Sequence, residues 1–299
     1  MTTSKKLLCT IAIFIAIVLT ITCVGIYSSY NNLTVNEYTV QSAKMSGSLN
    51  FVVIADLHDH SFGKDNQKLV DRVLTQKPDA VLMVGDFINK DSSDYEEFMA
   101  LVEQLSERVP VYFSWGNHEL GYVELHAEVD LVTFEKQLTD AGVVVLDKRY
   151  QDVEIAGQTI RIGGMYDYAF ALDSTNSCSP DTMDPEVYRF LTEFQESDDI
   201  FKLMLAHRPD SFVLGKASQT WDIDLVVSGH MHGGQVVLPF LGGVVGGDQG
   251  WFPEYVHGLY QKDKINIFIT SGLGSSKKAL PRFNNPPEIA VLHIVPETE

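Results

Sequence analysis

The chain has 299 residues, 45% of them hydrophobic, and a formal net charge of −18 at pH 7. This length suits one large domain or two small ones. The acidic balance excludes nucleic acid as a general partner, because binding a polyanion needs Lys and Arg, and a site for any anionic substrate needs a local positive centre. Only Cys178 of the three cysteines lies outside the N-terminal apolar stretch, so no disulfide framework is expected in the rest of the chain.

The N-terminus carries a long apolar stretch. Lys5 and Lys6 precede residues 7–27, which hold no charge. A helix of this length spans about 30 Å, the thickness of a bilayer core. We expect an uncleaved signal anchor, with a cleaved export signal (a weak site lies at residues 23–25) and a buried helix as alternatives. The two lysines predict that residues 1–6 are cytosolic and that the remainder lies on the extracytoplasmic side of a cell membrane crossed once.

Beyond the apolar stretch, the chain predicts a tether and one domain. Residues 28–48 are polar and are expected to form a tether with one early strand at most. From residue 49 to 299, buried apolar runs alternate with amphipathic segments, as in an α/β domain. No repeat or internal linker interrupts this pattern.

The expected elements follow in chain order. Strands are predicted at 49–55, 80–84, 109–114, 143–146, 202–206 and 223–227, with a hairpin over 153–162 and short strands near 236–238, 265–270 and 288–294. Helices are predicted at 66–76, 94–107, 124–140 and 185–195, and an irregular polar loop at 167–183.

Polar residues follow five of the expected buried strands. In α/β sheets, ligands gather beyond the carboxyl ends of the strands. The residues at these ends are Asp56 and His58, then Asp86, then Asn117 and His118, then His207, and finally His230 and His232. Asparagine, aspartate and histidine dominate the set, and together they predict a group of metal ligands.

Taken singly, each of these signals has a common structural explanation. Asp56 and His58 could form a surface turn, although extended backbone would point both side chains the same way. Asp86 could cap the next helix, and His207 could be a satisfied strand-end histidine. The joint occurrence at successive strand ends favours a metal site over these separate explanations.

The motifs D-x-H, G-D, G-N-H-E, a lone H, and G-H-x-H, at residues 56–58, 85–86, 116–119, 207 and 229–232, resemble those of the calcineurin-like metallophosphoesterases. The resemblance spans residues 51–295, and the stretch at 271–289 is similar to the tail of membrane-associated bacterial phosphodiesterases in that superfamily. It implies a four-layer α/β/β/α sandwich with a two-metal site at the strand ends, and a metal-dependent phosphoric ester hydrolase.

The resemblance also implies roles for the matching residues. One metal is held by Asp56, His58, Asp86 and His232, and the second by Asp86, Asn117, His207 and His230, so that Asp86 bridges. Manganese is the first expectation, with iron or zinc as alternatives. A metal-bridging hydroxide then attacks phosphorus, and His118 lies beside the phosphate, where it can protonate the leaving group.

Two positions depart from the family or adjoin its motifs. In the phosphoprotein phosphatase branch an aspartate three residues after the bridging one orients the catalytic histidine, and here that position is Asn89. The partner of His118 is therefore open, and a protein-phosphatase function is less favoured. His60, next to the first ligands, is expected to be a solvated neighbour and not a further ligand.

The substrate signals are weaker. Arg208 and Arg282 are candidates for contact with a substrate phosphate, although such arginines are more often surface ion-pair partners, and Lys277–Lys278 are expected to be solvent exposed. Residues 236–253, rich in Gly, Val, Leu, Phe and Trp, predict either a turn packed on the core or an apolar lip that admits an acyl chain or touches a bilayer.

Three functions follow from these expectations. The first is a phosphodiesterase acting on a lipid-linked or nucleotide-sugar phosphodiester or pyrophosphate at the membrane surface. The second is a phosphomonoesterase or phosphoprotein phosphatase on the same fold. The third, a binding module without activity, is disfavoured because no expected ligand position is missing.

Overall fold

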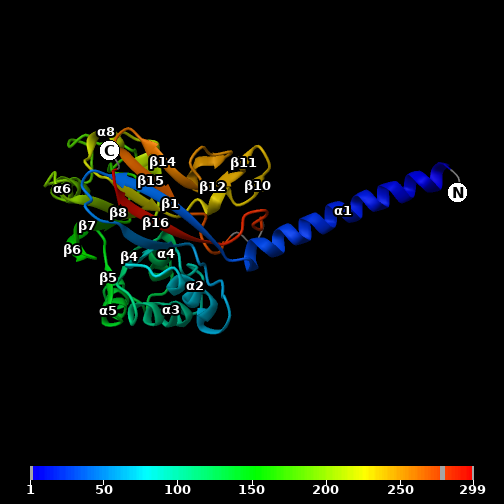
Figure 1. Ribbon diagram of the computed structural model, residues 1–299, viewed down its shortest axis with the longest axis horizontal. Helices are drawn as coiled ribbons and strands as arrows, with labels where there is room; N and C mark the ends of the chain where they lie inside the picture. The colour runs from blue at the N-terminus through cyan, green and yellow to red at the C-terminus, as the bar shows by residue number, and fades with distance from the viewer. Residues whose placement is uncertain (1–2, 277–279, 298–299) are drawn as a thin grey trace.

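The computed structural model describes residues 3–276 and 280–297. Lys277 and Lys278, which we expected to be exposed, lie outside the described residues. Figure 1 shows a domain built from two sheets and their helices, from which one long helix protrudes.

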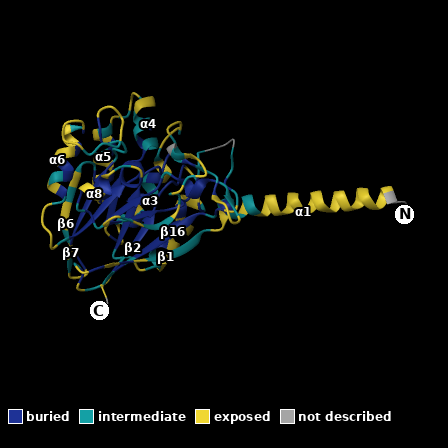
Figure 2. Ribbon diagram, turned by 90° about the horizontal axis from the view of Figure 1, so that it is seen from above, coloured by how far each residue is buried: buried dark blue, intermediate teal, exposed yellow. Residues whose placement is uncertain are grey.

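The protruding helix is α1 (Thr3–Asn31), and it is exposed along most of its length (Figure 2). Strand β1 (Thr34–Ser42) begins after only two further residues and pairs in parallel with β16 (Glu288–Pro296). The tether expected over residues 28–48 is therefore wrong. The single early strand anticipated there is part of the sheet, because its backbone bonds to a strand from the C-terminus.

The first sheet has six strands in the order β1-β16-β2-β3-β4-β5. Strand β16 is antiparallel to β2, and the four strands from β2 to β5 are parallel to one another. The carboxyl ends of these four therefore lie at one edge. The remaining members are β2 (Leu49–Ile54), β3 (Ala80–Val84), β4 (Val111–Ser114) and β5 (Val143–Val145).

The second sheet also has six strands, in the order β14-β15-β9-β8-β7-β6. Its inner strands β15, β9, β8 and β7 are parallel, and the two edge strands are antiparallel to their neighbours. The members are β6 (Arg149–Ile155), β7 (Gln158–Met165), β8 (Phe201–Ala206), β9 (Leu225–Ser228), β14 (Gly258–Lys262) and β15 (Ile265–Ile269).

Three apolar clusters hold four layers together. One lies between the two sheets, where the alternate residues Phe51 and Val53 of β2 meet Leu203 and Leu205 of β8. A second joins the first sheet to its helices, and a third joins the second sheet to its own. The four-layer α/β/β/α sandwich is thus confirmed. The helices are α2 (Gln67–Thr75), α3 (Glu96–Ser106), α4 (Asn117–Leu125) and α5 (Leu131–Asp140) by the first sheet, and α6 (Pro185–Phe194), α7 (Asp210–Val213) and α8 (Ala217–Thr220) by the second.

The single helix expected over residues 124–140 is two helices. Helix α4 begins within the G-N-H-E motif, and α5 begins after Asp130, whose carboxylate accepts a hydrogen bond from the Thr133 N–H at 2.9 Å. Val132, although apolar, is 78% exposed at the start of α5. The Asp130 cap starts a new helix inside the apolar pattern, and this divides the expected helix in two.

Short elements complete the chain between β9 and β14. They are the hairpins β10 (Val237–Leu238) with β11 (Gly242–Gly243) and β12 (Val245–Gly246) with β13 (Gly250–Trp251). Two 3₁₀ turns, η2 (His232–Gly234) and η3 (Gly247–Gln249), also occur between β9 and β14, and among the described residues a further one, η1 (Lys64–Asn66), precedes α2.

Candidate metal centre

The polar strand-end residues converge where the carboxyl ends of both sheets meet. Three groups of side chains place one ligand atom each within 4.8 Å of the others. They are Asp56 with His58 and His232, then His58 with Asp86 and His118, and then Asp86 with His207 and His230. His58 and Asp86 are shared between groups, so the three form one continuous cluster.

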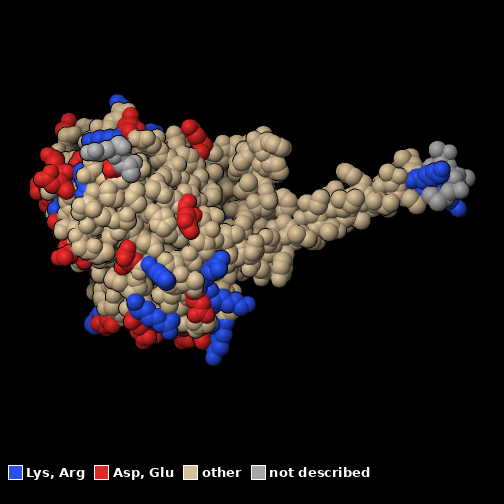
Figure 3. Space-filling view, in the orientation of Figure 1, with Lys and Arg blue, Asp and Glu red and all other residues tan. Residues whose placement is uncertain are grey.

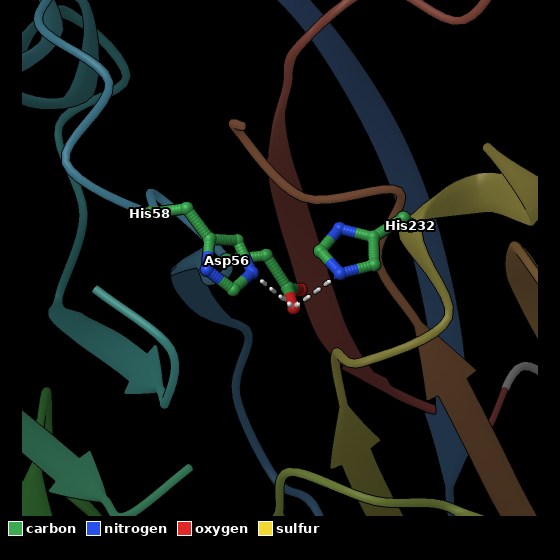
Figure 4. A group of neighbouring side chains, drawn as sticks. All are labelled: Asp56, His58 and His232. Carbon is green, nitrogen blue, oxygen red and sulfur yellow. Dashed lines mark ion pairs between the residues drawn. The ribbon is translucent and has the colours of Figure 1, made fainter. Parts of the chain in front are cut away.

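Contacts to two carboxylates organise this cluster. His207 Nε2 lies 3.1 Å from Asp86 Oδ2, and His58 Nε2 lies 3.7 Å from the same oxygen. The other carboxylate, Asp56, has its Oδ1 3.9 Å from His58 Nε2 and 3.8 Å from His232 Nε2 (Figure 4). His230 and His232, neighbours in one short motif, therefore belong to groups centred on different aspartates.

The donor set fits divalent metal ions. His58 Nε2, Asn117 Oδ1 and His232 Nδ1 are buried, and none of the three atoms has a hydrogen-bond partner. Leaving a buried polar atom unsatisfied costs about 1–3 kcal/mol, so three such atoms in one cluster point to a missing partner. Imidazole, carboxylate and amide ligands suit Mn, Fe and Zn.

Hydrogen bonds behind the cluster orient two of the imidazoles. His207 Nδ1 pairs with the Val84 carbonyl at 2.7 Å, and His58 Nδ1 pairs with Asn89 Oδ1 at 3.1 Å. In each ring, the partner at Nδ1 leaves Nε2 to face the aspartates. This is how outer hydrogen bonds commonly fix the tautomer of a ligating histidine.

Burial and neighbouring charges set the pKa values of the residues in this cluster. Burial raises the pKa of Asp56 to about 7, against the opposing charge of His207. Burial lowers the pKa of His58 to about 3, so its imidazole is neutral. Burial also acts to lower the pKa of His207, but the adjacent Asp86 outweighs it and raises that pKa to about 9.

Several of these residues have left-handed backbone. The φ angles are +54° at Asp56, +51° at His58, +59° at Asp86, +68° at His230 and +47° at His232. The expectation that Asp56 and His58 share extended backbone is therefore wrong, because the chain turns sharply at each. Non-glycine residues rarely take this conformation, and such strain clusters at functional sites.

Close backbone packing brings the second and third motifs together. A Cβ at Gly116 would collide with Asp86 Oδ1 and with the Asp86 backbone nitrogen, and a Cβ at Gly85 would lie 2.6 Å from Gly116 Cα. Only glycine permits this approach. The two glycines thus place Asp86 directly beside the start of α4.

Glu119 supports Asp86 in a role that the motif alone did not reveal. It is fully buried, and its carboxylate accepts hydrogen bonds from the N–H groups of Asp86 (2.9 Å), Phe87 (2.6 Å) and Gly116 (2.9 Å). Burial and the charge of Asp86 raise its pKa to about 7, while the N–H donors oppose that rise. Glu119 therefore holds the two motifs in register.

The structure identifies the partner of His118. Its ring Nδ1 accepts a hydrogen bond from the backbone N–H of Lys90 at 3.2 Å, and the backbone N–H of His118 donates to Asp86 Oδ1 at 2.8 Å. Asn89, at the position where an aspartate was looked for, bonds to His58 and to Asp59 instead. His60 pairs with the Tyr30 carbonyl at 2.7 Å and belongs to none of the three groups.

Arg282 does not occupy the place we expected. It is fully buried, and the five N–H groups of its guanidinium donate hydrogen bonds to four residues of the surrounding loops. The prediction that it contacts a substrate phosphate is wrong, because no donor is left for one. Arg208 lies with its guanidinium 3.2 Å from the centre of the Tyr168 ring and 3.9 Å from Asp210 Oδ2, and its contact with substrate stays a prediction.

Asn285 is a further supporting residue that sequence reasoning missed. Its Nδ2 donates to the carbonyls of His232 at 2.7 Å and Gln235 at 3.3 Å. It lies 53 residues from His232 along the chain. No local pattern links the two positions.

Comparison with known proteins agrees with this geometry. The calcineurin-like phosphoesterase family matches residues 49–234. The chain is 26% identical over 273 residues to the uncharacterized metallophosphoesterase YkuE of Bacillus subtilis, covering 89% of this chain and 86% of that protein. It is 27% identical over 229 residues to the phosphodiesterase YaeI of Escherichia coli, covering 74% and 72%.

A solved dimetal phosphatase from Danio rerio is similar at 13% identity and a TM-score of 0.40, covering 76% of this chain and 88% of that one. That likeness is too distant to carry a functional argument. The family match covers more than half of the chain and includes the residues that converge at the strand ends. The chain therefore belongs to the calcineurin-like phosphoesterase family and is a metal-dependent phosphoester hydrolase.

Proposed function

We propose that the protein is a phosphodiesterase with two divalent metal ions that acts on a lipid-linked or nucleotide-sugar phosphodiester or pyrophosphate at a membrane surface. The observation that carries this proposal is the pair of ligand groups centred on Asp56 and on Asp86, joined through His58. Two adjoining groups of this kind suit a pair of ions about 3.5–4 Å apart.

The residues divide between the two ions in this proposal. Asp56, His58 and His232 hold the first, and Asn117, His207 and His230 hold the second, with Asp86 shared. Manganese is the first choice, with iron or zinc as alternatives. When bound, the ions supply Lewis acidity to the phosphoryl oxygens and lower the pKa of water.

His118 is proposed as the general acid. Its Nδ1 accepts from the Lys90 N–H, so a neutral imidazole carries its proton on Nε2. That N–H can donate a hydrogen bond to the leaving oxygen as negative charge builds there, and transfer of a proton to that oxygen requires that the ring is first protonated to the imidazolium. We expect His118→Ala to slow hydrolysis of an alkyl phosphodiester far more than that of a p-nitrophenyl ester, whose leaving group needs no proton; equal losses would contradict the acid role.

A membrane location is supported by α1. Within residues 4–31 its most apolar window has a mean hydropathy of 2.9 and is 0% buried, which is typical of a membrane span or a signal sequence. A catalytic domain held at a bilayer would meet lipid-linked substrates without their leaving the membrane. The proposed orientation, with the domain on the extracytoplasmic side, follows from Lys5 and Lys6.

Metal analysis and a pair of chromogenic esters test the proposed activity. The full chain, purified with Mn²⁺, is expected to contain metal and to hydrolyse bis-p-nitrophenyl phosphate faster than p-nitrophenyl phosphate. Asp86→Asn should abolish both metal retention and hydrolysis. Asp198→Asn is the matched control, because this exposed aspartate precedes β8 at the strand end opposite His207.

The outcomes separate the candidate functions. Faster hydrolysis of the monoester would favour the phosphomonoesterase alternative. A metal-free and inactive protein would leave only the binding-module alternative. Loss of activity in Asp198→Asn as well as in Asp86→Asn would show that the assay reports folding and not the metal centre.

A further inference from the structure

Four large apolar side chains project from residues 236–253, here called the apolar lip. Phe240 is 107% exposed, Trp251 74%, Leu241 66% and Phe252 57%. A turn packed on the core would have buried them, so that alternative is wrong for these four. Contiguous exposed apolar side chains mark a surface that meets a protein or a membrane.

We infer that the apolar lip is a bilayer-contact surface that seats the entrance of the metal centre on the lipid leaflet entered by α1. The inference rests on the proposed phosphodiesterase function and assigns it a lipid-embedded substrate. Three features of the structure carry it.

First, the lip and α1 both pack against Phe283. Val236 forms a parallel bridge with Phe283, and the Val237 N–H donates to the Phe283 carbonyl at 3.0 Å. The Phe283 ring in turn packs on α1 so closely that a Cβ at Gly25 would collide with it. Figure 1 shows β10 and β11 on the side of the domain from which α1 leaves.

Second, the last turn of α1 is held to the domain by hydrogen bonds. Ser29, fully buried, accepts the Asn285 N–H at its Oγ at 3.0 Å. The Tyr30 hydroxyl accepts a hydrogen bond from the backbone N–H of Arg282 at 3.1 Å, and the Tyr30 carbonyl pairs with His60 Nε2 at 2.7 Å. The last turn of α1 is thereby part of the domain.

The length of α1 then determines how far the lip lies from the hydrocarbon core of the bilayer. A helix of 29 residues is about 43 Å long, whereas the hydrocarbon core is about 30 Å thick and takes about 20 residues. The uncharged stretch over 7–27 already overlaps Gly25, the first residue that packs on the domain. No span of helix separates the bilayer from the base of the lip, so the lip lies at the interface, where amphipathic surfaces bury about 5–10 Å into the leaflet.

Third, the lip adjoins the metal centre. A Cβ at Gly247 would lie 2.8 Å from the His230 ring, and a Cβ at Gly246 would lie 2.6 Å from the Met231 side chain. In Figure 3 charged side chains gather mainly along the left edge and the lower part of the domain, whereas the surface between lip and helix is uncharged in that view. A phosphodiester whose lipid chains stay in the leaflet would therefore meet the cluster beside His230.

Tryptophan fluorescence tests this contact directly. The chain has three tryptophans, of which Trp115 and Trp221 are buried and Trp251 is 74% exposed. We would place the full chain, one copy per disc, in nanodiscs of phosphatidylcholine and phosphatidylglycerol with or without brominated acyl chains. Bromine is expected to quench most of the emission that Trp251→Phe removes, and to leave the remaining emission unchanged.

Two variants sharpen the result. Phe240→Ser/Leu241→Ser is expected to reduce the quenching of Trp251 at least twofold. Leu172→Ser is the matched control, because Leu172 is 72% exposed but lies in the loop that precedes α6, outside the lip, and it should leave quenching unchanged.

Absence of quenching while α1 remains in the disc would overturn the inference. So would quenching that both variants reduce equally. Emission from Trp251 that changes only when several chains share a disc would assign the lip to a second copy of the chain and would also overturn it. Because the measurement needs no turnover, its failure is distinguishable from failure of the proposed phosphodiesterase activity.

Discussion

Replacement of Arg282 by lysine separates a structural from a substrate-binding role. The guanidinium donates to the carbonyls of Ser271 (2.8 Å), Gly274 (2.9 Å), Asn285 (3.0 Å) and Pro286 (3.2 Å), and to Asn285 Oδ1 (3.2 Å). Burial lowers the pKa of Arg282 to about 10, so the side chain stays charged at neutral pH. Lysine keeps the charge but has three donors, which cannot reach five acceptors in a planar fork.

The size of the effect follows from the acceptors left without a partner. Arg282→Lys deprives at least two buried oxygens of their hydrogen bonds, at about 1–3 kcal/mol each. We therefore expect the free energy of unfolding to fall by about 2–6 kcal/mol. For a domain of this size each kcal/mol lowers Tm by about 2–4 °C, so a loss of about 10 °C is expected.

Thermal unfolding followed by circular dichroism measures this loss, with KM for bis-p-nitrophenyl phosphate measured well below Tm. Arg72→Lys is the matched control, since Arg72 is exposed on α2 and the change should alter stability by less than about 0.5 kcal/mol. A variant at Arg282 that unfolds at the wild-type temperature but has a raised KM would refute the reasoning and return Arg282 to the substrate site.

Three further predictions address the supports of the site. Glu119→Gln places an amide donor against a backbone N–H and should lower both Tm and metal retention at pH 8, whereas the exposed control Glu103→Gln should do neither, as metal analysis and thermal unfolding would show. Glu288, held by His257 at 2.9 Å, has its pKa lowered from 4.5 to about 2 despite burial, and the pKa of His257 is raised above 6.5. The stabilisation by this pair is therefore fully present between about pH 4.5 and 6.5 and is lost as pH rises through the pKa of folded His257. His257→Asn should accordingly reduce the free energy of unfolding, measured in urea, less at pH 9 than at pH 5.5. A reduction that is the same at both pH values would contradict the assignment. Removal of metal by a chelator should lower Tm as well as activity, because the buried ligand atoms lose their partner, and re-addition of Mn²⁺ should restore both.

The strands were predictable because their residues are buried on both faces. The run at 80–84 is apolar throughout and forms β3 with the expected bounds, and the polar residues just beyond such runs converge as expected. The positions at which parallel strands end are fixed by topology, so sequence order alone indicated which side chains would meet.

Other features depend on contacts between distant segments. The three N–H groups that Glu119 binds come from two loops, and its role emerges only when Gly85 and Gly116 bring those loops together. Left-handed backbone at Asp56 and Asp86 could not be predicted from residue type, because aspartate tolerates it better than most residues yet adopts it at only a minority of positions. The burial of Arg282 was not predictable because four of its five acceptors are backbone carbonyls, which no side-chain pattern reveals.

Asn285 forms hydrogen bonds both with the last turn of α1 and with the backbone of a residue in the metal centre. The Asn285 N–H donates to Ser29 Oγ, while its side-chain amide donates to the His232 carbonyl. This buried asparagine therefore connects the last turn of α1 to the backbone of His232, in addition to the contacts that Tyr30 makes with Arg282 and His60. Cleavage near residue 25 would still leave Ser29 and Tyr30 bonded to the domain, although it would remove the glycine on which Phe283 packs. The boundary between the exposed part of α1 and the domain thus falls within the helix, and the helix end supports the site whether or not the preceding residues are retained.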